Sequence, residues 1–500
     1  MKKFKMPTAY TILLLLTAVV AVFTWIVPAG EYVEGVYSLK EANPQGIWQV
    51  LTAPIEGFFD ARGIIMFILV IGGFLGVTMK TGALDAGIAK LLKVFKGKEH
   101  LLIPLLMILF GIGGSTYGMA EETIAFYPLI IVVFLAAGYD VITAIMVIML
   151  GAGVGVLGST INPFAIGVAS EAIDIDLSVG MMHRFLLFIL VEAAAIFWTM
   201  KYAAKVKKDK SKSIVADLHE GHVKHFLKDK NIEGAKFEKK HAAVLLVFGI
   251  TFVIMILGVI PWAYKFGINI FDDLYNKVAN LSPIFGLEPN TTATYWDNWD
   301  NIKTQSAALG DWWFGQMTVL FLISSVVIGF VGRLKEKEIV ESFIQGAKDL
   351  LGVALIVGVA RGVKLVMAAG GMDATLLNSG YEALKGFGQV AFINLTYLFY
   401  IPMSFLIPST SGLAGVSMPI MGPLGQAIFS GAESGAALVI TAFSGAEGVV
   451  NLITPTSGVV MGALALAKVP YERWLKHVGK FLLVLSAIVM VVLTISAVFA

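Results

Sequence analysis

Runs of apolar residues that are long enough to cross a lipid bilayer recur along this 500-residue chain. A helix needs about 20 apolar residues to span the hydrocarbon core. Hydrophobic residues make up 57% of the sequence and charged residues 14%, whereas a soluble domain contains about 45–50% and about 25%. We therefore predict an all-α polytopic membrane protein. Its candidate spans are 8–28, 63–80, 141–158, 184–204, 241–263, 313–332, 353–369, 435–450 and 476–498.

The distribution of charge predicts how these spans are oriented. Cytoplasmic loops of membrane proteins are enriched in Lys and Arg. With a cytoplasmic N-terminus, 28 of the 37 Lys and Arg residues fall in cytoplasmic segments. This orientation requires two further apolar regions, 100–136 and 391–429, to enter and leave on the same side as re-entrant hairpins. The first apolar run is longer than a usual signal-peptide core and no typical cleavage site follows it, so we expect a retained first helix.

Composition argues against bound cofactors. The chain has no cysteine, which excludes disulfides and thiolate metal sites. His219, His222 and His225 have helical spacing, but they lie in a charged stretch and we expect no metal there. The net charge of +2 gives no reason to expect a nucleic-acid partner.

A charged segment, 205–240, divides the chain into two halves. It lacks a core-forming pattern, which is typical of a solvated cytoplasmic linker. The N-terminal half is then 1–204 and the C-terminal half is 241–500.

The two halves share an internal repeat. One offset relates four residue pairs, Ile55/Ile344, Gly57/Gly346, Asp60/Asp349 and Gly63/Gly352, and "STYGMAEETIAFYPL" and "STINPFAIG" have counterparts in "STSGLAGVSMPIMGPL" and "NLITPTSGV". About 50–180 therefore repeats as about 339–470. The span at 313–332 adds one crossing, so the second copy is inverted. Inverted repeats with interrupted helices are typical of secondary transporters, whose substrate site lies near the membrane midplane.

Each copy is interrupted twice by small and polar residues. "GGSTYG" and "PSTSG" interrupt the two hairpins, and "GSTINP" and "NLITPTSG" interrupt two broken helices, 141–180 and 435–468. Gly permits turns, Pro ends a helix, and Ser, Thr and Asn supply hydrogen-bonding groups. Irregular backbone at membrane depth is tolerated only where it faces protein or a watery cavity. We therefore expect the four interruptions to converge on a substrate site.

Charged residues near the interruptions favour a cationic substrate. Glu121 and Glu122 follow the first hairpin tip, and Glu447 lies one turn before the last interruption. Arg361 and Lys364 lie within a span. Three acids against two bases would be balanced by a ligand with net positive charge. An amino acid with a cationic side chain fits, with Arg361 or a helix N-terminus binding its carboxylate.

Each of these residues also has a structural interpretation. One of Glu121 and Glu122 could only cap or pair within the hairpin, since neighbours cannot share a helix face. Arg361 could pair with a glutamate, and Lys364 could extend to the membrane surface. Glu447 could be a protonated packing residue or a proton carrier.

Five stretches, "GMAEETIAFYPL", "STINPFAIGVAS", "VARGVKLVM", "FLIPSTSGLA" and "LITPTSGVVMGALAL", closely resemble the basic amino acid antiporters of the ArcD/YfcC family. That family is grouped with the anaerobic C4-dicarboxylate carriers in the ion transporter superfamily. The resemblance covers nearly the whole chain. It implies an elevator-type fold, arginine/ornithine exchange, a bacterial cytoplasmic (inner) membrane and, by superfamily analogy, a homodimer.

The resemblance also supplies candidate substrate-binding residues. In the superfamily, Ser, Asn and Thr residues at hairpin tips and helix breaks bind substrate and often sodium. Here the tips lack a Ser-Asn-Thr triplet and acids lie beside the first tip, which argues against sodium and a dianion. With the charged residues above, the candidate site is Ser115, Thr116, Tyr117, Glu121, Glu122, Ser159, Thr160, Asn162, Arg361, Ser409, Thr410, Ser411, Glu447, Asn451, Thr454, Thr456 and Ser457.

Other functions remain as alternatives at this stage. The first is a transporter of C4-dicarboxylates or related organic anions coupled to H⁺ or Na⁺. An intramembrane protease is suggested only by "GYD" at 138–140, and no second Asp stands in a G-x-G-D setting, so we expect no enzyme. A channel is disfavoured because inverted repeats with paired interruptions suit alternating access better.

Overall fold

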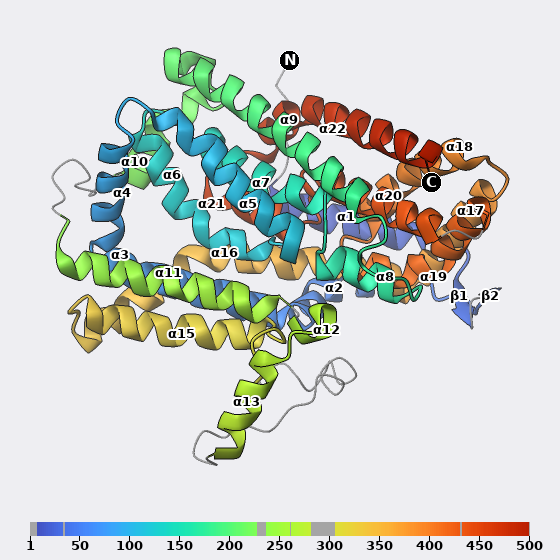
Figure 1. Ribbon diagram of the computed structural model, residues 1–500, viewed down its shortest axis with the longest axis horizontal. Coiled ribbons are helices and arrows are strands. Elements are labelled where there is room, and N and C mark those ends of the chain that lie inside the picture. The colour runs from blue at the N-terminus through green and yellow to red at the C-terminus, as the bar shows by residue number, and fades with distance from the viewer. Residues whose placement is uncertain are drawn as a thin grey trace. The chain divides into compact units, whose positions relative to one another are not determined.

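The computed structural model describes residues 8–33, 36–227, 237–260, 262–281, 306–430 and 433–499 (Figure 1). The basic segment 1–7 and part of the linker, 228–236, lie outside the described residues.

Helices long and apolar enough to cross a membrane dominate the chain. Among the described residues there are eight: α3 (Arg62–Lys80), η1 with α5 (Glu99–Tyr117), α9 (Met181–Lys208), α11 (Lys239–Val259), α15 (Phe314–Val331), α16 (Glu336–Ala369), α18 (Gln389–Leu406) and α22 (Tyr471–Phe499). This confirms the prediction of a mostly helical chain with several candidate membrane spans.

Shorter elements complete the description. The helices are α1 (Ala9–Phe23), α2 (Ile47–Asp60), α4 (Ala83–Val94), α6 (Tyr127–Ala136), α7 (Val141–Leu157), α8 (Val168–Glu171), α10 (His219–Leu227), α12 (Trp262–Phe266), α13 (Ile270–Leu281), α17 (Met372–Leu384), α19 (Thr410–Ile428), α20 (Glu433–Asn451) and α21 (Gly458–Leu466). Short turns are η1 (Glu99–Leu101), η2 (Glu121–Phe126), η3 (Pro163–Gly167), η4 (Lys210–Lys212) and η5 (Ala216–Leu218). One antiparallel ribbon pairs β1 (Gly30–Val33) with β2 (Val36–Leu39).

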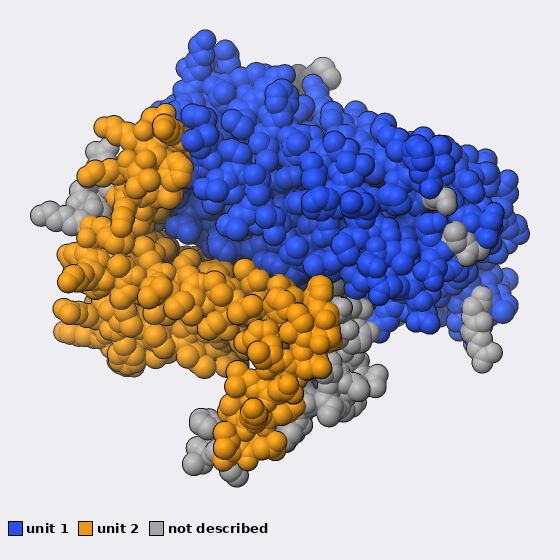
Figure 2. All heavy atoms as spheres, viewed as in Figure 1, with its two compact units in different colours: residues 1–61, 100–224, 355–500 blue, residues 62–99, 225–354 orange. Residues whose placement is uncertain are grey.

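The chain forms two compact units, which Figure 2 colours separately. Unit 1 contains residues 1–61, 100–224 and 355–500, and unit 2 contains 62–99 and 225–354. Each unit therefore draws on both halves of the sequence. All seventeen candidate site residues belong to unit 1.

The helices of unit 2 pack together through phenylalanine side chains. α3 packs against α15, and α11 packs against both α15 and α4. Phe74 of α3 stacks on Phe248 of α11 at 5.3 Å and contacts Phe321 of α15 edge-on at 5.0 Å. Helices in lipid gain no hydrophobic stabilisation by packing together, so packing contacts must hold them. Aromatic pairs such as these supply part of that stabilisation.

Helix boundaries recur with the spacing of the sequence repeat. Three boundary pairs are each 289 residues apart: the starts of α2 and α16 (47 and 336), the ends of α3 and α16 (80 and 369), and the starts of α4 and α17 (83 and 372). The copies differ at Ala61, where the first is interrupted between α2 and α3 while α16 continues for 34 residues. The inverted relation of the copies stays a prediction.

Both predicted hairpins consist of two helices separated by a short break. α5 and α6 are joined through η2, and α18 and α19 meet at residues 407–409. The predicted broken helices have the same form: α7 is followed by η3 and α8, and α20 by α21. The breaks fall at the Gly-, Ser- and Pro-containing motifs because those residues end helices or occupy turns.

Glycines bring α5 and α7 into close contact. A side chain at Gly155 of α7 would overlap the carbonyl of Gly111, and one at Gly114 of α5 would overlap the carbonyl of Ala152. Small residues at such crossings let two backbones approach closely, which is how helices associate in membranes. The first hairpin is therefore held tightly against the first broken helix.

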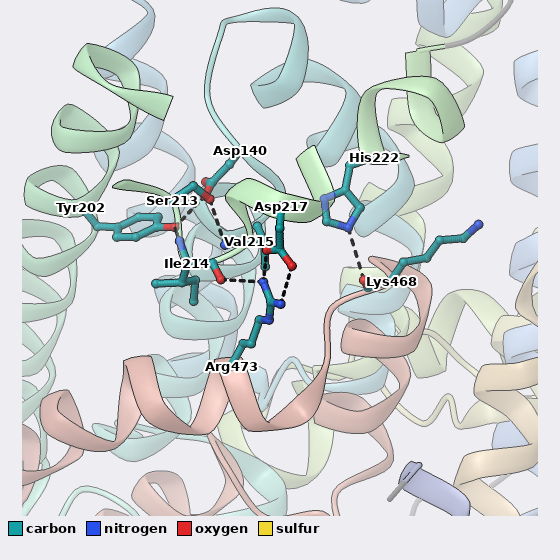
Figure 3. A network of polar contacts seen from close by, with 9 residues as sticks. All are labelled: Asp140, Tyr202, Ser213, Ile214, Val215, Asp217, His222, Lys468 and Arg473. Carbon is teal, nitrogen blue, oxygen red and sulfur yellow. Dashed lines mark hydrogen bonds and ion pairs between the residues drawn. The ribbon is translucent and has the colours of Figure 1, made fainter. Parts of the chain in front are cut away.

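The predicted linker is partly folded. Besides η4, η5 and α10, it makes polar contacts with distant parts of unit 1 (Figure 3). The Ser213 hydroxyl donates to Asp140 Oδ2 at 2.6 Å, and Arg473 pairs with Asp217. Polar groups in this part of the segment therefore have partners that lie far away in the sequence, and its role as a cytoplasmic linker stays a prediction.

Candidate functional site

The first hairpin turns at Gly118. Its φ of 76° lies in the left-handed region, which glycine adopts without strain. A Cβ at this position would also lie 2.5 Å from Oδ1 of Asn162. Gly118 therefore permits both the turn and the approach of the first broken helix, and it places Glu121 and Glu122 directly after the tip.

Hydrogen bonds join this tip to the break of α7. The Ser115 hydroxyl donates to the carbonyl of Gly158 and to the Thr160 hydroxyl, each at 3.1 Å. The Thr160 amide in turn donates to the Ser115 carbonyl at 2.9 Å. These bonds satisfy backbone groups that the interrupted helices leave without helical partners.

Asn162 organises the chain after the break. Its Oδ1 accepts from the amides of Phe164 and Ala165, and its Nδ2 donates to the Ser159 hydroxyl at 3.0 Å. Ser159 also donates to the Val156 carbonyl at 2.5 Å. Both side chains are buried, so their hydrogen bonds hold the break in shape.

The second hairpin is joined to the second broken helix through Glu447. Ser409 caps α19 by accepting from the Gly412 amide, and the next residue, Thr410, donates to Glu447 Oε1 at 2.5 Å. Asn451 donates to the same oxygen from one turn further along α20. Each hairpin tip thus contacts the broken helix of its own half.

The second break is held by local hydroxyl contacts. The hydroxyls of Thr454 and Thr456 lie 2.7 Å apart, and both residues are buried. Ser457 caps α21 by accepting from the Val460 amide at 3.4 Å. The start of α21 is therefore fixed by the sequence of the break.

Contacts between the halves gather these breaks in one region. α21 packs against η2, α19 packs against η3 and α8, and α20 packs against α7. The Ser444 hydroxyl of α20 donates to the carbonyls of Val156 and Leu157, each at 3.2 Å. Segments from both sequence halves thus form one polar region within unit 1.

The two adjacent glutamates have different environments. Glu122 is buried, and its Oε2 accepts from the Ala120 amide at 3.0 Å within the hairpin. Glu121 is half-buried, its side chain makes no hydrogen bond or ion pair with a described residue, and it interacts electrostatically with Glu122 and Glu447. Glu121 therefore interacts with an acid from each half of the sequence.

Glu447 offers a carboxylate oxygen to a ligand. The residue is 1% exposed, and both of its described donors bind Oε1. Its Oε2 is buried without a hydrogen-bond partner among the described residues. A buried polar atom without a partner is unfavourable, so a donor supplied by substrate would stabilise this oxygen.

Arg361 has a partner that the sequence did not suggest. Its Nε lies 3.6 Å from Asp60 Oδ2, at the end of α2. The two helices cross nearby, where a side chain at Gly57 would overlap the backbone of Gly358 and Gly362. Among the described residues Arg361 pairs with this aspartate and not with a glutamate, because α2 supplies a closer acid, and its contact with a substrate carboxylate stays a prediction.

Three further candidate residues make local or no side-chain hydrogen bonds. The Thr116 hydroxyl donates to the Ile112 carbonyl of its own helix at 2.7 Å. Tyr117 is buried and interacts electrostatically with Glu122. Ser411 is half-buried in the first turn of α19.

Comparison with known proteins gives the family. Residues 6–498 match the family described as "DcuC: C4-dicarboxylate anaerobic carrier". The chain belongs to the DcuC family. It is therefore a multi-pass membrane transporter that acts on a small-molecule substrate.

Curated relatives align with the chain over almost its full length. A Haemophilus influenzae protein described as uncharacterized is 30% identical, over 98% of this chain and 97% of its own. The Escherichia coli (strain K12) protein called "Putative basic amino acid antiporter YfcC" is 28% identical, over 99% of this chain and 97% of its own.

Two solved structures are also similar to this DcuC-family chain. The YdaH transporter of Alcanivorax borkumensis has a TM-score of 0.45 and 14% identity, over 99% of each chain. MtrF of Neisseria gonorrhoeae, from a class of antimetabolite efflux pumps, has the same TM-score and identity, over 97% of this chain and 95% of its own.

One residue that holds the site was missed from the sequence. Arg184 is fully buried at the start of α9, and its guanidinium donates to the carbonyls of Leu177 at 2.6 Å, Val179 at 2.9 Å and Thr160 at 3.3 Å. It therefore holds the first break in place. An arginine at the start of an apolar run was the available signal.

The "GYD" motif has a structural explanation. Asp140 caps α7, with Oδ1 accepting from the amide and hydroxyl of Thr143. Its Oδ2 accepts from the hydroxyls of Tyr202 and Ser213, each at 2.6 Å (Figure 3). Asp140 thus caps a helix and accepts hydrogen bonds from nearby hydroxyls, which are structural roles.

Proposed function

We propose that this DcuC-family transporter is a basic amino acid antiporter that exchanges arginine and ornithine by alternating access. The observation that carries the proposal is the group of three acids, Glu121, Glu122 and Glu447, in one polar region. Buried acids at membrane depth are unfavourable unless a cation or a proton balances them. A substrate with a positively charged side chain would supply that balance.

Two carboxylates are positioned to bind the cation. Glu447 has a free buried oxygen, and the half-buried Glu121 has no partner among the described residues. Donation from a guanidinium or ammonium group to charged oxygens gives the stronger class of hydrogen bond. The name of the Escherichia coli relative, a putative basic amino acid antiporter, agrees with this substrate class.

The substrate carboxylate requires a different partner. Arg361 is paired with Asp60, so helix N-termini are the better candidates. Two helices, α19 and α21, begin at the breaks of the second half, and α19 is the longer. It begins at Thr410, beside Glu447. Its first amides and its dipole would favour the substrate carboxylate there. Glu447, beside that helix start, would bind the neighbouring α-amino group, and Glu121 would bind the cationic side chain.

The family description favours a second candidate, a C4-dicarboxylate. A dianion would meet repulsion from Glu121 and Glu447 unless protons or sodium ions neutralised them. We therefore rank the dicarboxylate second.

Counterflow in proteoliposomes separates the two candidates. Vesicles loaded with arginine should take up labelled ornithine, with or without sodium, and should not take up labelled fumarate. The Glu121→Gln/Glu122→Gln double variant should lose that uptake, while Glu433→Gln, at the exposed start of α20, should keep it. Fumarate uptake without any amino acid signal would overturn the proposal in favour of the dicarboxylate.

The inverted topology, elevator-type mechanism and cytoplasmic N-terminus are part of the proposal. Because the chain lacks cysteine, single cysteines can be introduced and labelled without background. Lys96→Cys and Lys207→Cys should react from the cytoplasmic face of an inner membrane, and Asp176→Cys from the opposite face. Labelling from the reverse faces would contradict this orientation. Light scattering in detergent tests the proposed homodimer by giving the mass of the particle.

A further inference from the structure

Glu192 lies in the apolar part of α9, outside the candidate substrate site. Its side chain is 5% exposed, and neither carboxyl oxygen has a hydrogen-bond partner among the described residues. A buried acid with both oxygens unpartnered is rare, because burial removes the water that would bind them. The substrate mechanism above makes no use of it.

A glycine on the first hairpin provides the space for this carboxyl group. A Cβ at Gly111 of α5 would lie 2.6 Å from Glu192 Oε2. Gly111 is one helical turn before Ser115, which is bonded to Thr160. Glu192 thus rests directly against the helix that leads to the hairpin tip.

No charged group among the described residues neutralises Glu192 from the helices packed on α9. α7 carries no ionisable residue, and α5 carries only Tyr117. The lysines of η4 lie beyond the far end of α9. On α9 itself, His183, Arg184 and Lys201 are eight or nine residues away, about 12–14 Å along the axis.

The charged residues of α22 lie at a different level from Glu192. Ring contacts pair Trp198 with Phe481 at 5.1 Å and Tyr202 with His477 at 4.6 Å, so α9 and α22 run antiparallel. Glu192 is therefore opposite a part of α22 beyond Phe481. That part, to Phe499, has no ionisable residue, whereas Glu472, Arg473, Lys476, His477 and Lys480 all precede it.

We propose that Glu192 binds a proton and that this proton is exchanged during the transport cycle. An ionised carboxylate with no cation and no donor is strongly disfavoured in an apolar interior, so the side chain is neutral in this conformation. Movement of α5 would open or close the space beside Gly111 and change whether the carboxylate can be hydrated. Substrate movement and proton release would thereby be coupled.

A row of buried polar groups leads from Glu192 toward the end of α9. Thr199, two turns further along the same helix face, is fully buried with an unpartnered hydroxyl. Tyr202 follows and donates to Asp140 (Figure 3). Buried polar groups without protein partners are where internal water is found. Water along this face would carry the proton between Glu192 and the end of the helix.

Infrared spectroscopy tests proton binding without any assumption about the substrate. The spectrum of the purified wild-type chain in lipid minus that of Glu192→Gln should contain a protonated-carboxyl carbonyl band that titrates with pH, apart from the bands that other buried acids such as Asp311 give to both chains. Glu433→Gln is the matched control and should retain the band. A Glu192→Gln spectrum identical to wild type across the pH range would overturn the proposal, whether or not arginine is transported.

Transport distinguishes an exchanged proton from a permanently bound one. A pH gradient across wild-type proteoliposomes should drive net ornithine movement, and Glu192→Gln should lose it while keeping arginine/ornithine counterflow at equal pH. Glu192→Asp should shift the pH dependence and serves as a second variant if the amide fails to fold. The proposed coupling would be wrong if ornithine movement in wild type did not depend on the pH gradient. It would also be wrong if the gradient still drove ornithine movement in Glu192→Gln. Should no amino acid be transported at all, the infrared result alone decides proton binding.

Discussion

The hydroxyl of Thr410, at the tip of the second hairpin, donates to Glu447 Oε1 at a distance of 2.5 Å. This bond ties the first turn of α19 to the last turn of α20 and leaves Oε2 of the same carboxyl group without a described partner. In the first half, Ser115 ties the other tip to Thr160. The halves therefore share a mode of attachment, but only the second builds it on an acid.

Substitution of Glu447 by Gln should weaken substrate binding without disturbing the hairpin. The amide oxygen can still accept from Thr410 and Asn451, while the charge that would meet a cationic substrate is lost. A hydrogen bond to a charged group contributes about 1.5–3 kcal/mol, which is roughly a 10- to 150-fold rise in KM. Counterflow measured over a range of ornithine concentrations gives this value.

A matched variant, Thr410→Val, separates charge from attachment. It removes the donor to Oε1 and keeps the carboxylate, so it should lower stability by about 1 kcal/mol. If Glu447→Gln left KM unchanged while Thr410→Val raised it, Glu447 would act only as a hairpin anchor.

Single substitutions of the two adjacent glutamates should have different effects, one on stability and the other on KM. Glu122 caps its own hairpin, so Glu122→Met should lower thermal stability, by about 1–3 kcal/mol, with little effect on KM. The half-buried Glu121 has no such bond, so Glu121→Gln should raise KM and leave stability unchanged. Thermal unfolding in detergent and counterflow are measured on the same preparations. The reverse pattern would assign the substrate to Glu122.

Much of the architecture could be predicted because its causes are local. Apolar run length sets the spans, and Gly, Ser and Pro set the positions of the breaks, so residues such as Gly118 and Ser457 could be placed from the sequence. The Asp60 partner of Arg361 could not, because 300 residues separate them and the pairing depends on how α2 crosses α16. The different environments of Glu121 and Glu122 depend on a tight turn that sequence spacing does not specify.

Ser115 and Thr160 should be energetically coupled. Ser115→Ala and Thr160→Val each remove part of one shared set of hydrogen bonds, so each should cost about 1 kcal/mol. The double variant should cost less than the sum, by about 0.5 kcal/mol or more. Thr116→Ala supplies the comparison, since the Thr116 hydroxyl bonds only to its own helix and should combine additively with Thr160→Val. Additive losses for the first pair would show that the tip and the break are held independently.

Asp311, just before α15, should make stability depend on pH. Burial, with a smaller contribution from the charge of Asp272, raises the pKa of Asp311 from 3.8 to about 7. A carboxyl group whose pKa is raised on folding stabilises the fold while it is protonated. That contribution is fully present below about pH 4 and is lost as the pH rises through about 7. Because one pKa unit corresponds to about 1.4 kcal/mol, the loss should be on the order of a few kcal/mol.

Asp311→Asn isolates this effect because the amide is neutral at every pH. At pH 8 the variant should unfold at a higher temperature than wild type, and at pH 4 the two should unfold together. Asp272→Asn keeps the titrating group and removes part of the repulsion, so it should move the wild-type transition to lower pH. Thermal unfolding of the full chain in detergent, measured from pH 4 to pH 8 for wild type and both variants, tests these expectations. An Asp311→Asn curve parallel to wild type at both pH values would show that Asp311 stays ionised in the folded protein.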